Sequence, residues 1–272
     1  MSKIEFKNIW NITLFDIKCN LKYLLSWTLG LTTFVAIYML FFPYVEEIGM
    51  AKLEVLPEEM LQLFNINDIN EMSNYTSYFV MIYSLAMLVT SIFAVNLAST
   101  LLVKPEKDKT IEYLYSLTIS RSEIYLSKLL TTSIWITIAL YGMGFSGIIC
   151  GALFNYDTYS FTDILLIIKY SAIIPYLFAF ITICLGSIKT DLGSTSFGSF
   201  IIFVVYLIGY LGTLVGEKFV LLTYISPFVT ACSSDILSID TNSVIAIAIY
   251  YFIAIFSLFI GYTFYKKRDI QM

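Results

Sequence analysis

Residues 75–103, YTSYFVMIYSLAMLVTSIFAVNLASTLLV, form an uncharged and almost wholly apolar stretch. A helix needs about 20 such residues to cross the roughly 30 Å of hydrocarbon in a bilayer. The stretch is long enough for one membrane-spanning helix, and the charged run that begins at Lys104 ends it. This pattern favours a membrane protein over a soluble domain.

The composition of the whole chain agrees with this interpretation. Of its 272 residues, 58% are hydrophobic and 13% are charged, against about 45–50% and 25% in soluble domains. Histidine is absent and the four cysteines lie far apart, which argues against zinc sites and against Ser-His-Asp or Cys-His catalysis. The net charge of −4 is unlike that of nucleic-acid binders. We therefore expect no catalytic residue, no metal site and no nucleic-acid partner.

Five further stretches are long and apolar enough to cross a bilayer. The predicted fold is all-α: one polytopic transmembrane domain over residues 1–272 with six membrane-spanning helices. The predicted spans cover approximately residues 24–45, 75–103, 125–154, 164–188, 195–215 and 242–265.

A seventh apolar stretch lies within residues 217–240. It is short and Pro227 interrupts it, so we expect a re-entrant or interfacial segment on the outer side.

The distribution of positive charge predicts the orientation. Thirteen of the sixteen Lys and Arg residues lie in the two terminal segments and in the connections on their side of the predicted spans. Positive residues stay on the cytoplasmic side, so both termini are expected in the cytoplasm and the lipid bilayer is an expected partner.

The first 22 residues have the pattern of a surface helix. Apolar side chains recur at helical spacing on one face, and polar or basic side chains occupy the opposite face. The apolar face carries Phe6, Trp10, Leu14, Ile17 and Leu21. Such a segment lies in the membrane plane; alternatively, its positive charges serve only as an orientation signal.

The connection over residues 104–124 carries two local signals. Pro105 suits the first turn of a helix, and Ser120 to Glu123 have the S-x-x-E pattern of a capping box, which starts the third span. On pattern alone, the short amphipathic helix between them is either a docking element or a solvated turn.

Four polar residues inside the spans are candidates for a transport path: Asn96, Ser99, Lys169 and Ser171. A lysine inside the hydrocarbon is costly, so Lys169 either faces a polar path or extends its ammonium to the interface. The other three either line a path or bond a neighbouring helix.

Residues 106–130, EKDKTIEYLYSLTISRSEIYLSKLL, resemble a signature of type-2 ATP-binding-cassette (ABC) export permeases. In that family the pattern E-x-x-x-G-T-x-E-x-L-L-S-x-P-I-S-R-x-x-I-x-x-x-K-L-L recurs after the second span. The order of elements is also similar: an interfacial helix, six spans, a short segment between spans five and six, and a basic tail.

The resemblance implies a permease subunit that exports a hydrophobic or amphipathic peptide, antibiotic or similar solute across the plasma membrane. It implies that residues 104–118 form a coupling helix on a separate ABC ATPase subunit, and that a second permease subunit, identical or related, completes the path. The implied coupling residues are Glu106, Thr110, Ile111, Glu112, Leu114, Leu117 and Arg121.

Under the same interpretation this chain is not an enzyme and binds no cofactor, since it has no G-x-x-x-x-G-K-[ST] motif. ATP and Mg²⁺ are then expected on the partner ATPase. A gradient-driven transporter or channel is the alternative, and it predicts paired ionisable groups at the midplane or an inverted repeat. An intramembrane enzyme ranks last, because it needs convergent ionisable groups inside the spans.

Overall fold

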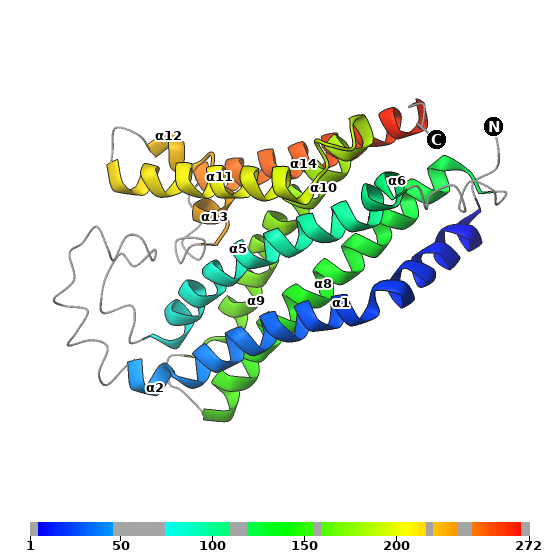
Figure 1. The fold of residues 1–272 in the computed structure, drawn as a ribbon. Helices are drawn as coiled ribbons and strands as arrows, with labels where there is room; N and C mark the ends of the chain where they lie inside the picture. Colours follow the sequence, from blue (N-terminus) through cyan, green and yellow to red (C-terminus); the bar gives the residue numbers. More distant parts are fainter. Residues whose placement is uncertain are drawn as a thin grey trace.

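The computed structural model describes residues 5–45, 74–108, 119–154, 159–215, 220–232 and 241–267. These residues form a bundle of helices with no strand among them, and six helical segments are long and apolar enough to cross a membrane. The predicted all-α class and the number of spans are therefore confirmed. Successive long helices run in alternating directions, so α1 begins and α14 ends at the same end of the bundle (Figure 1).

The helix bounds follow the predicted spans closely after the first one. The second and third spans are α5 (Tyr75–Leu102) and α8 (Arg121–Phe154), and the fifth and sixth are α11 (Thr195–Val215) and α14 (Thr241–Lys267). Asn74 begins α5 as its N-cap, where its side chain accepts a hydrogen bond from the Thr76 amide at 2.8 Å. This local cap fixes where α5 starts.

The first span differs from the prediction. The structure has one continuous helix, α1 (Phe6–Leu40), in place of a separate surface helix over residues 1–22 followed by a span. No proline or glycine interrupts α1 before Gly30, so nothing breaks its hydrogen-bond ladder. The helix ends at Phe41, and the single turn α2 (Phe42–Tyr44) follows around Pro43.

The fourth span consists of two helices, α9 (Phe161–Ser171) and α10 (Ile173–Ile188), which meet at Ala172. Pro175 explains the interruption, because its nitrogen has no hydrogen to donate to the carbonyl of Ser171 four residues earlier.

In two segments between the spans, the helices that the structure describes are short. After α5, the structure describes the single turn α6 (Lys104–Lys107), and residues 109–118 of the predicted coupling helix lie outside the described residues. Between α11 and α14 it describes α12 (Val220–Thr223) and α13 (Pro227–Thr230). Phe228 of α13 packs against Phe178 of α10 at 5.5 Å between ring centroids, so this segment inserts among the long helices.

The core forms around α5. This helix contacts α1, α8, α9, α10 and α11, and 67% of its most apolar window is buried, the largest share among the six candidate spans. Two other packed pairs, α1 with α8 and α10 with α14, complete the bundle around it. The lower and upper parts of the bundle in Figure 1 therefore meet at α5.

The tight turn between α10 and α11 depends on two glycines. Gly193 lies against Gly186 so closely that a Cβ at position 193 would come within 2.3 Å of the Gly186 Cα. The same turn packs against Val103 at the end of α5. The turn is thereby fixed beside α6.

We predict that Gly193→Ala destabilises the protein by about 1–3 kcal/mol, because the added methyl group would meet backbone atoms that cannot move aside. The measurement is the apparent melting temperature of the purified protein in detergent micelles. Ser196→Ala is the matched control, since Ser196 is exposed on the helix that follows, and it should leave the melting temperature nearly unchanged. Equal melting temperatures for the two variants would contradict the close packing of the glycines.

Candidate functional site

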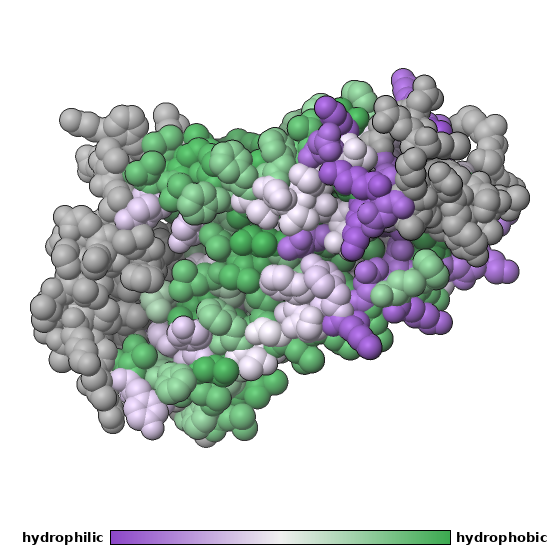
Figure 2. All heavy atoms as spheres, viewed as in Figure 1, coloured by the Kyte–Doolittle hydropathy of each residue, from purple (hydrophilic) through white to green (hydrophobic). Residues whose placement is uncertain are grey.

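One end of the bundle carries almost all the charge. Among the described residues, every charged side chain except Asp163 and Lys169 lies in the half of the molecule that contains the start of α1, α6, the α10–α11 turn and the end of α14. Figure 2 shows these hydrophilic residues gathered at that end, beside an apolar surface over the middle of the molecule. We call it the charged end. The connection over residues 109–118 joins α6 to Ser120 there.

A buried ion pair joins α1 to α8 near the charged end. The Lys128 ammonium donates hydrogen bonds to both carboxylate oxygens of Asp16, at 2.7 Å and 2.8 Å. The two side chains are only 5% and 7% exposed. Close by, the Thr13 hydroxyl donates to the Ile9 carbonyl of its own helix at 2.9 Å and, over a longer distance, to the Ser127 carbonyl at 3.4 Å. Because charges removed from water are costly unless they are paired, each of these two side chains requires the other at this position.

The carboxylate of Glu123 forms a second link between the same two helices. It accepts hydrogen bonds from the Ser120 amide and hydroxyl, both at 2.7 Å, which confirms the predicted capping box at the start of α8. It also accepts bonds from the backbone amide of Glu5 at 2.8 Å and from the Asn8 side chain at 3.1 Å. One buried carboxylate therefore caps α8 and holds the first turn of α1.

The start of α8 is bonded to the end of α14 as well. The hydroxyls of Ser122 and Tyr262 lie 3.0 Å apart, and the Tyr125 hydroxyl donates to the Leu258 carbonyl at 3.0 Å. Tyr125 also packs against Tyr265 at 5.6 Å between ring centroids. The first residues of α8 therefore contact both the start of α1 and the end of α14. In the sequence, these residues of α8 come soon after the connection over residues 109–118.

An exposed ion pair lies at the same end. The Lys107 ammonium of α6 is 3.3 Å from the Asp191 carboxylate in the α10–α11 turn, and the two side chains are 43% and 70% exposed. Exposed pairs of this kind contribute little to stability. The exposed pair therefore provides a control for the stability contributed by the buried pair.

The predicted coupling residues are only partly described. Glu106 lies half-buried in α6, and Arg121 is the half-buried first residue of α8. The other five predicted residues lie outside the described residues: Thr110, Ile111, Glu112, Leu114 and Leu117. The charged end therefore holds the two described members, one on each side of the connection.

The four predicted path residues are not gathered in one place. Asn96 and Ser99 lie on α5, half-buried and buried respectively, whereas Lys169 and Ser171 lie on α9. The Ser171 hydroxyl donates to the Ile167 carbonyl of its own helix at 2.7 Å. Lys169 is exposed, with its ammonium 5.8 Å from the centre of the Tyr170 ring.

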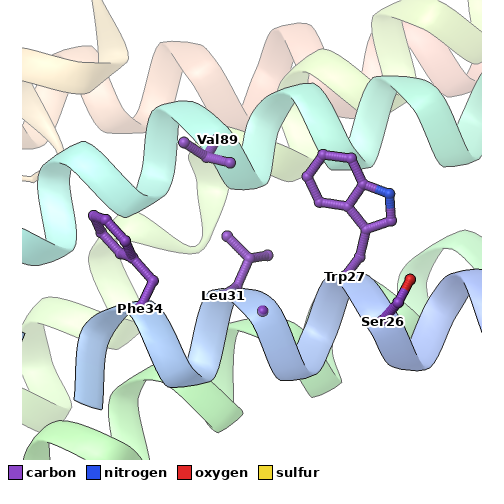
Figure 3. A pocket seen from close by; sticks show the side chains of 6 residues that line it. Ser26, Trp27, Leu31, Phe34 and Val89 are labelled. Carbon is purple, nitrogen blue, oxygen red and sulfur yellow. The ribbon is translucent and has the colours of Figure 1, made fainter. Parts of the chain in front are cut away.

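A groove lies between α1 and α5 on the described surface. It has a volume of about 340 Å³. The side chains of Trp27, Leu31 and Phe34 point from α1 toward α5, from which Val89 faces them (Figure 3). The lining is completed by small residues of α1, Ser26 and Gly30.

One predicted path residue, Asn96, is aligned with this groove. It follows Val89 by seven residues, which is close to two helical turns, so both lie on the same face of α5. Phe93, on one side of that face, stacks on Trp27 of α1 at 5.6 Å, whereas Val95, on the other side, lies against Gly198 of α11. Asn96 therefore lies between the α1 and α11 contacts of α5.

Sequence reasoning missed the ion pair, the second role of Glu123 and the groove. A signal for the pair was present in the spacing: Asp16 continues a buried series with Ile9, Ile12 and Thr13, a face of α1 distinct from the predicted apolar stripe. An acidic residue in such a series indicates a buried cationic partner. The predicted stripe is largely exposed, with Phe6 72% and Trp10 43% exposed.

The family described as "Multidrug efflux system permease Rv1217c, C-terminal domain" matches residues 16–266 of this chain. No curated protein matches the chain, and no solved structure does.

We predict that Asp16→Leu and Lys128→Met each destabilise the protein by about 3–5 kcal/mol, because each leaves one charge buried without its partner. The double variant D16L/K128M should be nearly as stable as the wild type, since it removes both charges and keeps apolar volume. The measurement is the free energy of unfolding in mixed micelles titrated with SDS.

Asp191→Leu is the matched control for these variants. It breaks the exposed pair with Lys107 at the same end of the bundle, and it should cost no more than about 1 kcal/mol. Single variants at Asp16 and Lys128 that cost no more than the control would show that the buried pair does not form.

Proposed function

Because this chain belongs to the family of multidrug efflux permeases typified by the Rv1217c C-terminal domain, we propose that it is the membrane subunit of an ATP-driven exporter. The family match over residues 16–266 carries the proposal, and six helices apolar enough to cross a membrane agree with it. A separate ABC ATPase subunit binds ATP and Mg²⁺, and this chain supplies the path.

The ATPase part of the proposal rests on residues 106–130, which resemble the type-2 ABC export signature. Two residues of that run, Glu123 and Lys128, have defined structural partners in this fold. The coupling surface is assigned to residues around the connection at the charged end: Glu106, Thr110, Ile111, Glu112, Leu114, Leu117 and Arg121. Apolar members of a short amphipathic helix can dock in a groove of a partner protein.

The charged end faces the cytoplasm of the cell in this proposal, and the protein lies in the plasma membrane. Ten Lys and Arg residues are described at that end against six Asp and Glu residues, and positive charge is retained on the cytoplasmic side. Both chain termini are then cytoplasmic. An ATPase can reach the permease only from that side.

Two permease subunits, identical or related, form the path. The face made by α1, α5 and α11 supports this assignment, because it carries the groove between the first two of these helices. Ser26 and Gly30 share one face of α1 at the spacing that lets helix backbones approach closely in membranes. A Cβ at Gly30 would meet no atom within 4 Å.

The lining of the groove supports a hydrophobic or amphipathic cargo, such as a peptide, an antibiotic or a similar drug. Trp27 and Phe34 offer aromatic surface without charge, which suits apolar ligands of varied shape. Asn96, and Ser99 one turn further along α5, supply the polar groups of the path. Lys169 and Ser171 lie on α9 and are assigned to a part of the path away from the groove. The alternative for Lys169 is that its exposed ammonium extends to the membrane interface.

A gradient-driven transporter is the second candidate. It requires ionisable groups paired near the middle of the membrane. The buried ion pair between Asp16 and Lys128 joins the eleventh residue of α1 to the eighth of α8, both toward the charged end. This position favours the ATP-driven proposal.

We predict that the protein co-purifies with an ATPase that carries a P-loop, and that Leu114→Ala and Glu112→Ala reduce the amount recovered at least about tenfold. The physical reason is the loss of an apolar anchor and of a charged contact in the docked helix. The measurement is the ratio of ATPase to permease after affinity purification of the tagged permease.

Leu153→Ala is the control for co-purification, because Leu153 is 72% exposed near the opposite end of α8. It should leave the recovered ATPase unchanged. Drug export by the pure permease in vesicles that contain an ion gradient and no nucleotide would contradict the proposal.

We also predict that Trp27→Ala and Phe34→Ala lower the export of aromatic drugs by about tenfold, because each variant removes apolar contact surface from the groove. The measurement is drug accumulation in cells that express permease and ATPase together. Phe252→Ala, at a residue of α14 that is 68% exposed, is the aromatic control and should leave accumulation at the wild-type level. Equal export by all three variants would contradict the assignment of the groove.

A further inference from the structure

The first half of α1 is attached to the first turns of α8 by polar contacts at three successive levels. Glu123 binds the Glu5 amide and the Asn8 side chain, at 2.8 Å and 3.1 Å. Thr13 bonds the Ser127 carbonyl, and Asp16 pairs with Lys128. The two helices run parallel along this contact, because rising residue numbers on α1 meet rising numbers on α8.

These contacts restrict motions that apolar packing alone permits. A purely apolar interface resists separation of two helices but tolerates small sliding and rotation, since dispersion and hydrophobic contacts have no directional preference. Lys128 and Asp16 make two charge-assisted hydrogen bonds with strict geometry, in a site closed to water. A displacement of α8 along its axis must break these bonds or move α1 with it.

The two helices lie between the proposed ATPase-binding connection and the α1–α5 groove. In the sequence, the start of α8 follows the connection over residues 109–118. The proposed function assigns the binding of the ATPase to this connection. From Asp16, α1 continues without interruption to the groove residues Trp27, Leu31 and Phe34. A rigid attachment near Asp16 therefore acts on the groove through about three to five turns of a single helix.

We propose that Asp16, Lys128 and Glu123 are positioning residues that join α1 and α8 into one rigid unit, through which movement at the start of α8 reaches the α1–α5 groove. This inference rests on the proposed function. The ion pair is then a mechanical link, and its removal uncouples ATP hydrolysis from transport even when the fold is intact.

The test uses two double variants of the ion pair. D16L/K128M replaces the ion pair by apolar contact, and D16K/K128D exchanges the two charges so that the pair can form in reverse. Asp191→Leu, which breaks the exposed pair with Lys107, is the control. If the exchanged variant does not fold, D16L/K128M and the control decide the outcome.

The first measurement uses the permease alone, so it does not depend on an ATPase. Spin labels are placed on Cys19, which is exposed on α1, and on the cysteine of the Ile138→Cys variant, at a residue 46% exposed on α8. The described cysteines other than Cys19 are buried. We expect a narrow distribution of label distances in the wild type and the control, a broader one in D16L/K128M, and a narrow one again in D16K/K128D.

The second measurement uses the permease with its ATPase in vesicles and records drug molecules exported per ATP hydrolysed. This ratio should fall at least about fivefold in D16L/K128M, the lower end of typical coupling between two sites. The KM for ATP should be unchanged, and D16K/K128D should restore the ratio. A merely structural role would lower the yield of folded protein without changing the ratio.

Each outcome bears on a separate claim. An unchanged distance distribution in D16L/K128M overturns the rigid unit, and an unchanged transport ratio overturns its mechanical role. If the wild-type permease binds no ATPase, the proposed function fails, and the label distances still report whether α1 and α8 are held together by the pair.

Discussion

Hydrocarbon offers no hydrogen-bond partners, and this constraint governs the structure from the backbone outward. Backbone groups inside a bilayer must bond within their own helix, and most small polar side chains here do the same. Hydroxyls on four of the spans donate to the carbonyl four residues earlier, as the following residues illustrate: Thr28, Thr90, Ser91, Thr132, Thr182 and Ser187. With these groups satisfied locally, helices pack through apolar and aromatic contacts, and strongly polar contacts between helices concentrate at the charged end.

The same constraint explains which parts of the fold could be predicted from the sequence. Spans are visible because they exclude charge over a fixed length, so the bounds of α11 and of α5 follow from composition alone. The start of α8 was also predictable, because a capping box involves Ser120 and Glu123, which are three residues apart. Whether α1 is one helix or two depends instead on its packing along α8, and the amphipathic pattern of its first 22 residues does not contain that information.

The site was less predictable because its contacts join distant parts of the chain. Asp16 and Lys128 are 112 residues apart, and Glu5 and Glu123 are 118 apart. The groove raises the same difficulty, since Trp27 becomes part of it only through the position of Val89 on α5. Asn96 was identified as an isolated polar residue in a span, and only its alignment with Val89 relates it to the groove. Residues chosen by polarity alone, such as Ser171, prove to be bonded within their own helix.

The length of α1 explains why a buried ion pair is tolerated there. A helix of 35 residues extends about 52 Å, well beyond the roughly 30 Å of hydrocarbon. Asp16 and Lys128 lie toward the charged end of their helices, where each side chain can pair while the protein inserts without either charge crossing to the midplane. Replacing the pair by apolar residues would cost the fold little, so stability alone gives weak reason for its presence. What the pair adds is a fixed register between two helices, and such a register matters most where force passes from one helix to the other.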